Sequence, residues 1–407
     1  MNSSFMNIIL LAPEFLPVWG GVGSYVVELA RNLPKDICIH IIAPKRNGFN
    51  NEKVTTDNYD LQSIFPDNVK IHFICEANDT FLYNAKFQYA CFKYLPKIIK
   101  NENIDLIHTH TAQMPDILLQ LRKLNVPIVT TLHTTINGQR RASKDSGLKF
   151  SELEFSEKAT YMLYPLLASL EYIYHQKKRN YIAVSKWTRD QIVNKYNLDP
   201  SSIEVIHNGV NTNVFCPKNT QKGYEYFPEL KDIDVPIILS TSRLIAAKGG
   251  SFLVKAIPEI LEHEDVHFVF AGTGKNGFNI SKENCTFLGY VDYLKMPYLY
   301  SLSDIFILSS LYENFPMSIL ESMASGIATI STKVGGVPEI IKNGKNGLLI
   351  PRMNTEAIVN SILNLAENEN KRKKLGKKAR KDVEKNFDWN IAAKNTKKVY
   401  ESALEVN

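Results

Sequence analysis

Residues 309–326 have the sequence Ser-Ser-Leu-Tyr-Glu-Asn-Phe-Pro-Met-Ser-Ile-Leu-Glu-Ser-Met-Ala-Ser-Gly and directly follow the apolar run 305–308. The apolar run predicts a buried strand. Pro316 suits the first turn of a helix, because proline lacks the N–H that would have no helical partner there. Gly326 suits the end of that helix. The stretch therefore predicts a strand, a loop and a short helix, a unit typical of α/β domains.

Two acidic residues in this stretch indicate a ligand. We expect Glu313 in the loop and Glu321 about two turns into the helix. The unpaired N–H groups that follow Pro316, at residues 317–319, favour an anion at the helix start. Carboxylates repel phosphate, so they are expected to hold hydroxyl groups instead. A ligand with a diphosphate between two hydroxyl-rich groups is a nucleotide sugar.

Length and composition limit the class of protein. A chain of 407 residues exceeds one ordinary domain, so we expect two. The net charge of +6 is too small to indicate nucleic acid as a partner. The five cysteines are scattered without a C-x-x-C pair, which favours a reducing compartment. The sequence shows no signal peptide and no apolar run that would span a membrane, which predicts a cytoplasmic protein.

Short apolar runs alternate with helical patterns through the first half of the chain. We expect a doubly wound parallel sheet, with ligands beyond the carboxyl ends of its strands. The predicted strands are 7–12, 37–43, 69–74, 105–109, 128–132 and 181–184. The predicted helices are 84–99, 113–124 and 152–178, and the basic stretch 135–149 is predicted to be a mobile loop.

Three features fall at the expected ligand edge of this sheet. Gly20 and Gly21 lie in a strand-to-helix turn, which is either a plain tight turn or a place where backbone approaches a ligand. His108 and His110 share one face of a strand, but no cysteine or acidic cluster supports a metal site there. His133 follows a strand end and is either a loop histidine without a ligand or a hydrogen-bond donor to a sugar or its leaving group.

The second half contains a pair of cations in a similar place. Arg243 and Lys248 lie after the strand predicted at 237–240 and before a helix. An arginine binds phosphate oxygens in a bidentate manner and a lysine acts as a point charge, so the pair suits a diphosphate. Gly272 lies in a loop where the backbone can approach the nucleotide sugar. Tyr290 is as consistent with stacking on a base as with simple packing.

The spacing Glu313-x7-Glu321, together with Arg243 and Lys248, resembles the large retaining glycosyltransferase family 4. The resemblance extends over nearly the whole chain and implies the GT-B fold. That fold has two Rossmann-like, doubly wound parallel-sheet domains that face each other across a cleft. The implied parts are an acceptor-binding domain (1–211), a linker (212–234), a donor-binding domain (235–386) and a C-terminal helix that crosses back to the first domain (387–407).

The resemblance also implies roles for residues. The catalytic residues would be His133, Arg243, Lys248 and Glu313, with Glu313 on the donor sugar and Glu321 on the ribose. The residues expected to bind the donor are Gly20, Gly21, Arg243, Lys248, Gly272, Tyr290, Glu313, Asn314, Phe315, Pro316, Met317, Ser318 and Glu321. Because cations and the helix start would neutralise the diphosphate, neither a metal nor another cofactor is expected.

The implied activity is retaining transfer of a sugar from a UDP- or GDP-sugar to a hydroxyl of a sugar, lipid-linked or small-molecule acceptor. Cell-surface polysaccharide or glycolipid synthesis is the implied pathway. Basic residues between 371 and 381 would allow peripheral contact with the inner, anionic membrane face, although interspersed acids favour a solvated helix surface. The alternatives are a nucleotide-sugar 2-epimerase of the same fold, a nucleotide-sugar binding protein without transferase activity, and a hydrolase that uses the two glutamates.

Overall fold

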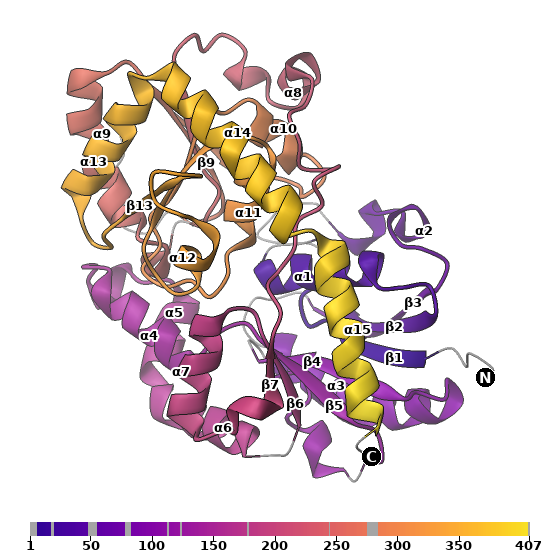
Figure 1. Ribbon diagram of the computed structural model, residues 1–407. Helices are drawn as coiled ribbons and strands as arrows, with labels where there is room; N and C mark the ends of the chain where they lie inside the picture. The colour runs from indigo at the N-terminus through magenta and orange to yellow at the C-terminus, as the bar shows by residue number, and fades with distance from the viewer. Residues whose placement is uncertain are drawn as a thin grey trace. The chain divides into compact units, whose positions relative to one another are not determined.

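The computed structural model describes residues 6–17, 20–47, 55–77, 83–111, 114–122, 124–176, 179–243, 245–274 and 284–405 (Figure 1). The chain divides into two compact units. Unit 1 contains residues 1–135, 169–208 and 389–407, and unit 2 contains residues 136–168 and 209–388. Residues 18 and 19 of the predicted glycine-rich turn lie outside the described residues.

Unit 1 is built on a seven-stranded parallel sheet with the order β3-β2-β1-β4-β5-β6-β7. Its central strands are almost wholly buried, because helices cover both faces of a parallel sheet and leave little room for polar residues. The strands are β1 (Met6–Leu11), β2 (Ile37–Lys45), β3 (Val69–Glu76), β4 (Leu106–His110), β5 (Ile128–Leu132), β6 (Asn180–Ala183) and β7 (Ile203–Val205). All predicted strands of the first half are therefore confirmed within a few residues.

The helices of unit 1 are α1 (Gly21–Asn32), α2 (Leu61–Ile64), α3 (Tyr83–Asn101), α7 (Lys186–Tyr196) and α15 (Trp389–Glu405). Helix α15 contacts α1, β5 and β6, although it is the last helix of the chain. Its Tyr400 is fully buried, and the hydroxyl lies 2.6 Å from Nδ1 of His108 on β4. This contact ties the end of the chain to the middle of the first sheet.

Unit 2 is built on a six-stranded parallel sheet with the order β10-β9-β8-β11-β12-β13. The strands are β8 (Ile237–Ser240), β9 (His267–Ala271), β10 (Cys285–Gly289), β11 (Ile305–Leu308), β12 (Ala328–Thr332) and β13 (Leu348–Ile350). The helices are α4 (Ile136–Asp145), α5 (Phe155–Met162), α8 (Thr220–Tyr226), α9 (Gly250–His263), α10 (Met296–Ser301), α11 (Met317–Ala324), α12 (Val337–Ile340), α13 (Thr355–Ala366) and α14 (Glu369–Asn386). Helix α6 (Tyr164–His175) crosses the division between the units.

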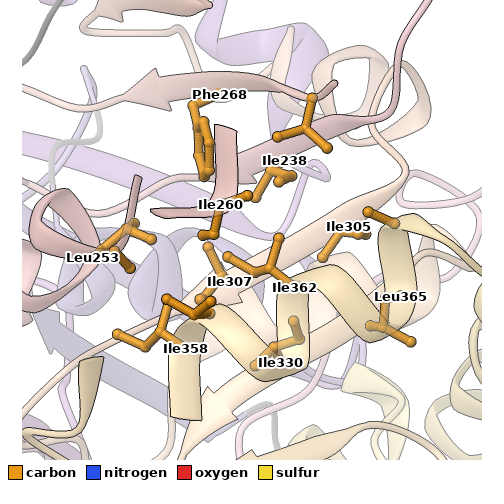
Figure 2. Close-up of a cluster of buried hydrophobic side chains, with 14 of the residues drawn as sticks. Ile238, Leu253, Ile260, Phe268, Ile305, Ile307, Ile330, Ile358, Ile362 and Leu365 are labelled. Carbon is orange, nitrogen blue, oxygen red and sulfur yellow. The ribbon is translucent and has the colours of Figure 1, made fainter. Parts of the chain in front are cut away.

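Branched aliphatic side chains form the core of unit 2. Helices α9 and α13 lie side by side (Figure 1), and their apolar faces pack on the sheet. Figure 2 shows Leu253 and Ile260 of α9 and Ile358 of α13 close to Ile307 and Ile330 of the strands. All five side chains are at most 1% exposed, so burial of apolar surface stabilises this arrangement. The continuous apolar run at 305–308 is the central strand β11, as predicted.

Three predictions of local structure are wrong. The stretch 135–149 is not a mobile loop, because most of it forms α4, which packs against the residues before α9. The predicted long helix 152–178 is divided into α5 and α6, because Pro165 has no N–H to continue the hydrogen bonding of α5. The predicted helix 113–124 contains only a short 3₁₀ helix at Leu119–Leu121 within its described residues.

Residues expected to form a linker also have structure of their own. The stretch 212–234 contains α8 and a 3₁₀ helix at Pro228–Leu230, and α8 packs on α10. A Cβ atom at Gly223 would lie 3.0 Å from the side chain of Leu302, so a larger residue there would require Leu302 to shift. Residues 212–234 therefore form part of unit 2.

Candidate functional site

Each sheet reverses its strand order at one point. In unit 1 the chain moves outward from β1 to β2 and β3 and then returns to β4 beside β1. In unit 2 the corresponding neighbours are β8 and β11. Ligands of doubly wound sheets bind beyond the carboxyl ends of the strands at such switch points. The residues predicted from the sequence follow the strands at or next to these points, except Tyr290, which follows β10.

The switch point of unit 2 carries an ion pair. Lys248 follows β8 and Glu313 follows β11, and the Lys248 Nζ atom lies 2.6 Å from Glu313 Oε1. The Ser310 hydroxyl donates a hydrogen bond to the same oxygen at 2.7 Å. The side chains of Lys248 and Glu313 are only 28% and 11% exposed, so both charged groups are partly withdrawn from water. Two residues that are 65 positions apart in the sequence are thus brought into direct contact.

Two glycines allow the loops of this site to pack closely. Gly249 has φ +64°, and a Cβ atom there would lie 2.1 Å from the Ser309 carbonyl oxygen. Gly335 has φ +51°, and a Cβ atom there would lie 1.5 Å from the Glu313 carbonyl oxygen. Both positions therefore need glycine for conformation and for space. The backbone N–H of Leu311 also donates to Ala247 O at 3.0 Å, which joins the loops after β8 and β11.

Arg243 lies in the same loop as Lys248 but has a different environment. Its side chain is exposed and forms no ion pair with any residue that the structure describes. Gly272, which follows β9, has φ +156°, and a Cβ atom there would lie 2.4 Å from the Ser242 carbonyl oxygen. Gly272 is thus required for the packing of the Arg243 loop. The guanidinium of Arg243 is available to an anion.

Glu321 lies just over one turn into α11, and not two, because Pro316 is the N-cap and the helix begins at Met317. Its carboxylate is buried, and Oε2 accepts a hydrogen bond of 2.9 Å from the hydroxyl of Tyr300 on α10. The Tyr300 hydroxyl also lies 3.2 Å from Thr241 Oγ1. Burial raises the pKa of Tyr300 well above its usual value, so this hydroxyl remains a proton donor to Glu321.

The other residues expected to bind the donor around α11 divide into two groups. Asn314, Phe315, Pro316 and Met317 are buried, and the Phe315 ring packs on Phe387 with a centroid distance of 5.7 Å. Ser318 is half-buried, as is Tyr290 after β10. Within the described part of the chain, the Pro316 N-cap has no side-chain hydrogen bond to the first turn of α11. The side chains of Phe315 and Met317 thus belong to the core. The backbone of the first turn of α11, by contrast, provides N–H groups that can bind a ligand.

Helices α4 and α5 also support this site, although no pattern in the sequence predicted it. Gly138 of α4 lies against the Tyr312 ring so closely that a Cβ atom would be 2.2 Å from its Cζ. Glu157 of α5 is buried, and its Oε1 accepts hydrogen bonds from the Ala247 N–H at 3.3 Å and from the Ser143 hydroxyl at 3.2 Å. Glu157 therefore helps to hold the backbone next to Lys248. Such contacts join residues about 90 positions apart, and no local pattern indicates them.

In unit 1, Gly20 and Gly21 begin α1 directly after the loop that follows β1. Gly20 is the N-cap with φ −151°, and a Cβ atom there would lie 2.4 Å from Oε2 of Glu14. Gly21 is exposed, and no atom of the described residues lies within 4 Å of such a Cβ position. A side chain at Gly20 would therefore require the flexible Glu14 carboxylate to move, and Gly21 leaves the helix start open.

His133 is half-buried and lies against buried aromatic side chains at the ends of β4 and β5. Its Nε2 lies 3.2 Å from Nδ1 of His110, and its ring contacts the Tyr25 ring edge-on with a centroid distance of 4.6 Å. Burial lowers the pKa of His133 to about 3 and that of His110 well below its usual value. Both imidazoles are therefore neutral at pH 7. A neutral imidazole offers one donor and one acceptor.

His108, the third histidine of this group, has a structural explanation. Its Nε2 lies 2.7 Å from Thr131 Oγ1 and its Nδ1 contacts Tyr400, so both ring nitrogens have partners. Among the residues that the structure describes, no group of three or more His, Cys, Asp or Glu side chains is arranged to hold a metal ion. No helix within the described ranges is long and apolar enough to cross a bilayer.

Comparisons with known families place the predicted site residues of the two units in two different family models. The model for glycosyltransferase family 4 matches residues 19–214, which include Gly20, Gly21 and His133. The model for glycosyl transferases group 1 matches residues 225–382, which include Arg243, Lys248, Glu313 and Glu321. The chain is a group 1, family 4-like glycosyltransferase with the GT-B fold.

Some relatives of this glycosyltransferase match nearly its whole length, and others match about half of it. It is 26% identical to an uncharacterized glycosyltransferase of Methanocaldococcus jannaschii over 98% of this chain and 99% of that protein. It is 31% identical to spore coat protein SA of Bacillus subtilis over 54% of this chain and 64% of that protein. Among solved structures, it is similar to Anabaena HepE in complex with UDP-glucose, with a TM-score of 0.68 and 16% identity over 98% of this chain and 100% of that chain.

Proposed function

We propose that this glycosyltransferase moves a sugar from a UDP- or GDP-sugar to a hydroxyl acceptor, with retention of anomeric configuration and without a metal ion. The observation that carries the proposal is the meeting of Lys248 and Glu313 at the switch point of unit 2, beside the exposed Arg243. A cation and a carboxylate side by side suit a ligand with both phosphate and hydroxyl groups. The UDP-glucose complex of HepE supports the choice of donor class.

In this proposal the donor replaces one half of the Lys248–Glu313 ion pair. The diphosphate takes over the Lys248 ammonium, and the freed Glu313 carboxylate accepts hydrogen bonds from the sugar hydroxyls. Arg243 and the first turn of α11, whose N–H groups donate to no N-cap side chain, supply further positive potential for the departing diphosphate. These groups are preorganised by the glycine contacts of their loops, so little reorganisation is needed during the reaction.

Glu321 is proposed to hold the ribose. Tyr300 occupies one of its carboxylate oxygens and fixes the orientation of the side chain. His133 is proposed to donate or accept a hydrogen bond at the donor sugar as a neutral imidazole, since its pKa of about 3 excludes the charged form at pH 7. The acceptor is proposed to be a sugar, a lipid-linked compound or a small molecule.

The test of donor binding is thermal unfolding of the full chain with UDP, GDP and ADP and their common sugar conjugates, each with and without EDTA. A ligand at about 100-fold over its Kd adds about 2.7 kcal/mol to the free energy of unfolding. A shift with one base that EDTA does not change is the expected result. The absence of any nucleotide shift would overturn the proposal, and a shift that EDTA abolishes would overturn its metal-free part.

Product analysis tests the reaction itself. With the donor identified, transfer to a panel of hydroxyl acceptors is followed by NMR of the anomeric proton. A product with the anomeric configuration of the donor supports a retaining transferase. Conversion of the donor to a 2-epimer, or release of free sugar without transfer, would contradict it.

A further inference from the structure

His110 is a buried polar residue whose presence is not explained by stability. It is the last residue of β4, its side chain is fully buried, and its Nδ1 atom lies 3.2 Å from Nε2 of His133. Within the described part of the chain, its Nε2 atom has no hydrogen-bond partner. A buried nitrogen without a partner lowers stability, and an apolar side chain of similar size would avoid this loss. The hydrogen bond to His133 is therefore the interaction that accounts for a histidine here.

His108 provides a comparison on the same strand. It lies two residues before His110 on β4, shares a face with it and is equally buried. Its Nε2 lies 2.7 Å from Thr131 Oγ1 on β5, and its Nδ1 contacts the Tyr400 hydroxyl on α15. His108 therefore stabilises the fold through both ring nitrogens, whereas His110 combines one hydrogen bond with an unsatisfied nitrogen.

The residues at the end of β4 hold His133 at two points. The His110 ring holds its imidazole, and Thr111 Oγ1 accepts a hydrogen bond of 3.1 Å from its backbone N–H. The Thr111 hydroxyl in turn donates to the Thr134 carbonyl oxygen at 3.3 Å. The Tyr25 ring contacts the His133 ring edge-on with a centroid distance of 4.6 Å. The backbone of His133, the plane of its ring and one ring nitrogen are thus all held in place.

The contact between the two imidazoles contains one hydrogen atom. Both rings are neutral at pH 7, so each has one N–H group and one bare nitrogen. One ring donates and the other accepts, and this choice also decides which nitrogen of His133 carries its hydrogen. Nδ1 of His133 then has the complementary role, as an acceptor when Nε2 donates and as a donor when Nε2 accepts.

We propose that His110 is a positioning residue of the transfer reaction, which holds the His133 ring in one tautomer so that Nδ1 of His133 meets the sugar with a fixed hydrogen-bonding role. This role rests on the proposed function, in which His133 contacts the donor sugar. An imidazole that could flip or change tautomer would present the correct atom for only part of the time. The unsatisfied nitrogen of His110 is the loss of stability that accompanies this arrangement.

The spectroscopic test uses the full chain with 15N-labelled histidine and does not depend on activity. The shifts of the ring nitrogens distinguish the two tautomers, and a His133→Gln variant assigns the His133 signals. We expect one tautomer of His133 in the parent and a mixture of both in His110→Leu. Identical His133 signals in the parent and in His110→Leu would overturn the proposal.

Stability and kinetics separate positioning from a structural role. His110→Leu is expected to keep or raise the urea midpoint of the parent, whereas His108→Leu breaks two hydrogen bonds and is expected to lower it. With the donor identified by thermal shift, His110→Leu is expected to lower kcat by about tenfold, with a smaller change in KM. In a His133→Gln background, the same substitution is expected to change kcat by less than about twofold, because it acts through His133.

Two further outcomes would overturn the proposal. Unfolding of His110→Leu, or a urea midpoint as low as that of His108→Leu, would assign His110 to the fold alone. An equal loss of kcat in the parent and His133→Gln backgrounds would show that His110 does not act through His133. The absence of any nucleotide-induced thermal shift would instead contradict the proposed function, and the NMR comparison would still decide whether His110 fixes the tautomer of His133.

Discussion

The switch point of unit 2 carries opposite charges, whereas the corresponding edge of unit 1 carries neutral imidazoles. Lys248 and Glu313 form a partly buried ion pair, with Arg243 exposed in the same loop. The Nε2 atom of His133 lies 3.2 Å from Nδ1 of His110, and burial lowers the pKa values of both imidazoles. Similar sheets thus present different chemistry, because the residues after each strand, and not the sheet, determine it. Charges suit a diphosphate, and neutral donors and acceptors suit hydroxyl groups.

The largest expected effect comes from removing the positive charge of Lys248 in unit 2. Lys248→Ala is expected to lower the transfer rate on the order of 10²-fold, because it removes a preorganised cation from the departing diphosphate. Rates with saturating donor measure this. The control is Lys255→Ala, an exposed lysine on α9. An unchanged rate in Lys248→Ala would contradict the proposal that this cation stabilises the departing diphosphate.

The second prediction concerns the packing that holds the ion pair in place. Gly335→Ala is expected to lower the free energy of unfolding by about 3 kcal/mol, because a positive φ and a backbone clash add together. Gly344 is a matched control, since it has φ +72° but no described atom within 4 Å of a Cβ position. Gly344→Ala should cost about 1 kcal/mol for conformation alone. Urea unfolding of both variants measures the difference, and equal losses would show that the clash is relieved.

The third prediction tests the neutral histidines of unit 1. Burial lowers the pKa of His108 to about 3, whereas in the unfolded chain it titrates near 6.5. The unfolded state therefore binds a proton that the folded state does not bind between these values. Stability is fully present above pH 6.5 and falls as the pH decreases, by up to about 1.4 kcal/mol per pH unit for each such histidine.

Urea unfolding at pH 7.5 and pH 5.5 checks this sign, and NMR of the imidazole protons checks the individual groups. The ring signals of His133 are expected to stay constant over this range. A titration of His133 between pH 5.5 and 7.5 would show that it becomes charged and would weaken the contrast between the two units.

The smallest expected effect belongs to a residue that acts through another. Glu157→Gln keeps the size of the side chain but weakens its hydrogen bond to the Ala247 N–H beside Lys248. We expect a loss of about 1 kcal/mol in stability and a rise of KM for the donor that exceeds the change in kcat. Glu152→Gln, which changes another acidic residue of the same segment, is the control. Equal changes in KM for the two variants would assign Glu157 to local structure alone.

The features that depend on neighbouring residues along the chain could be predicted from the order of amino acids. Apolar runs such as 305–308 predicted the strands, because a strand buried on both faces of a parallel sheet must be continuously apolar. The residues after β5, β8 and β11 marked the ligand edge, because carboxyl ends of parallel strands meet there. Arg243, Lys248, Glu313 and His133 could therefore be named from the sequence as candidates, and their roles stay predictions.

Contacts between residues far apart in the chain became visible only in the folded molecule. The Lys248–Glu313 pair, the hydrogen bond from Tyr300 to Glu321 and the support of Ala247 by Glu157 join residues 65, 21 and 90 positions apart. The exposure of the apolar face of α6 could not be predicted either. Periodicity shows that a helix has two faces but not which one is buried. Burial and pairing are properties of the packed molecule, and they decide which charges are paired and which surfaces are free to bind.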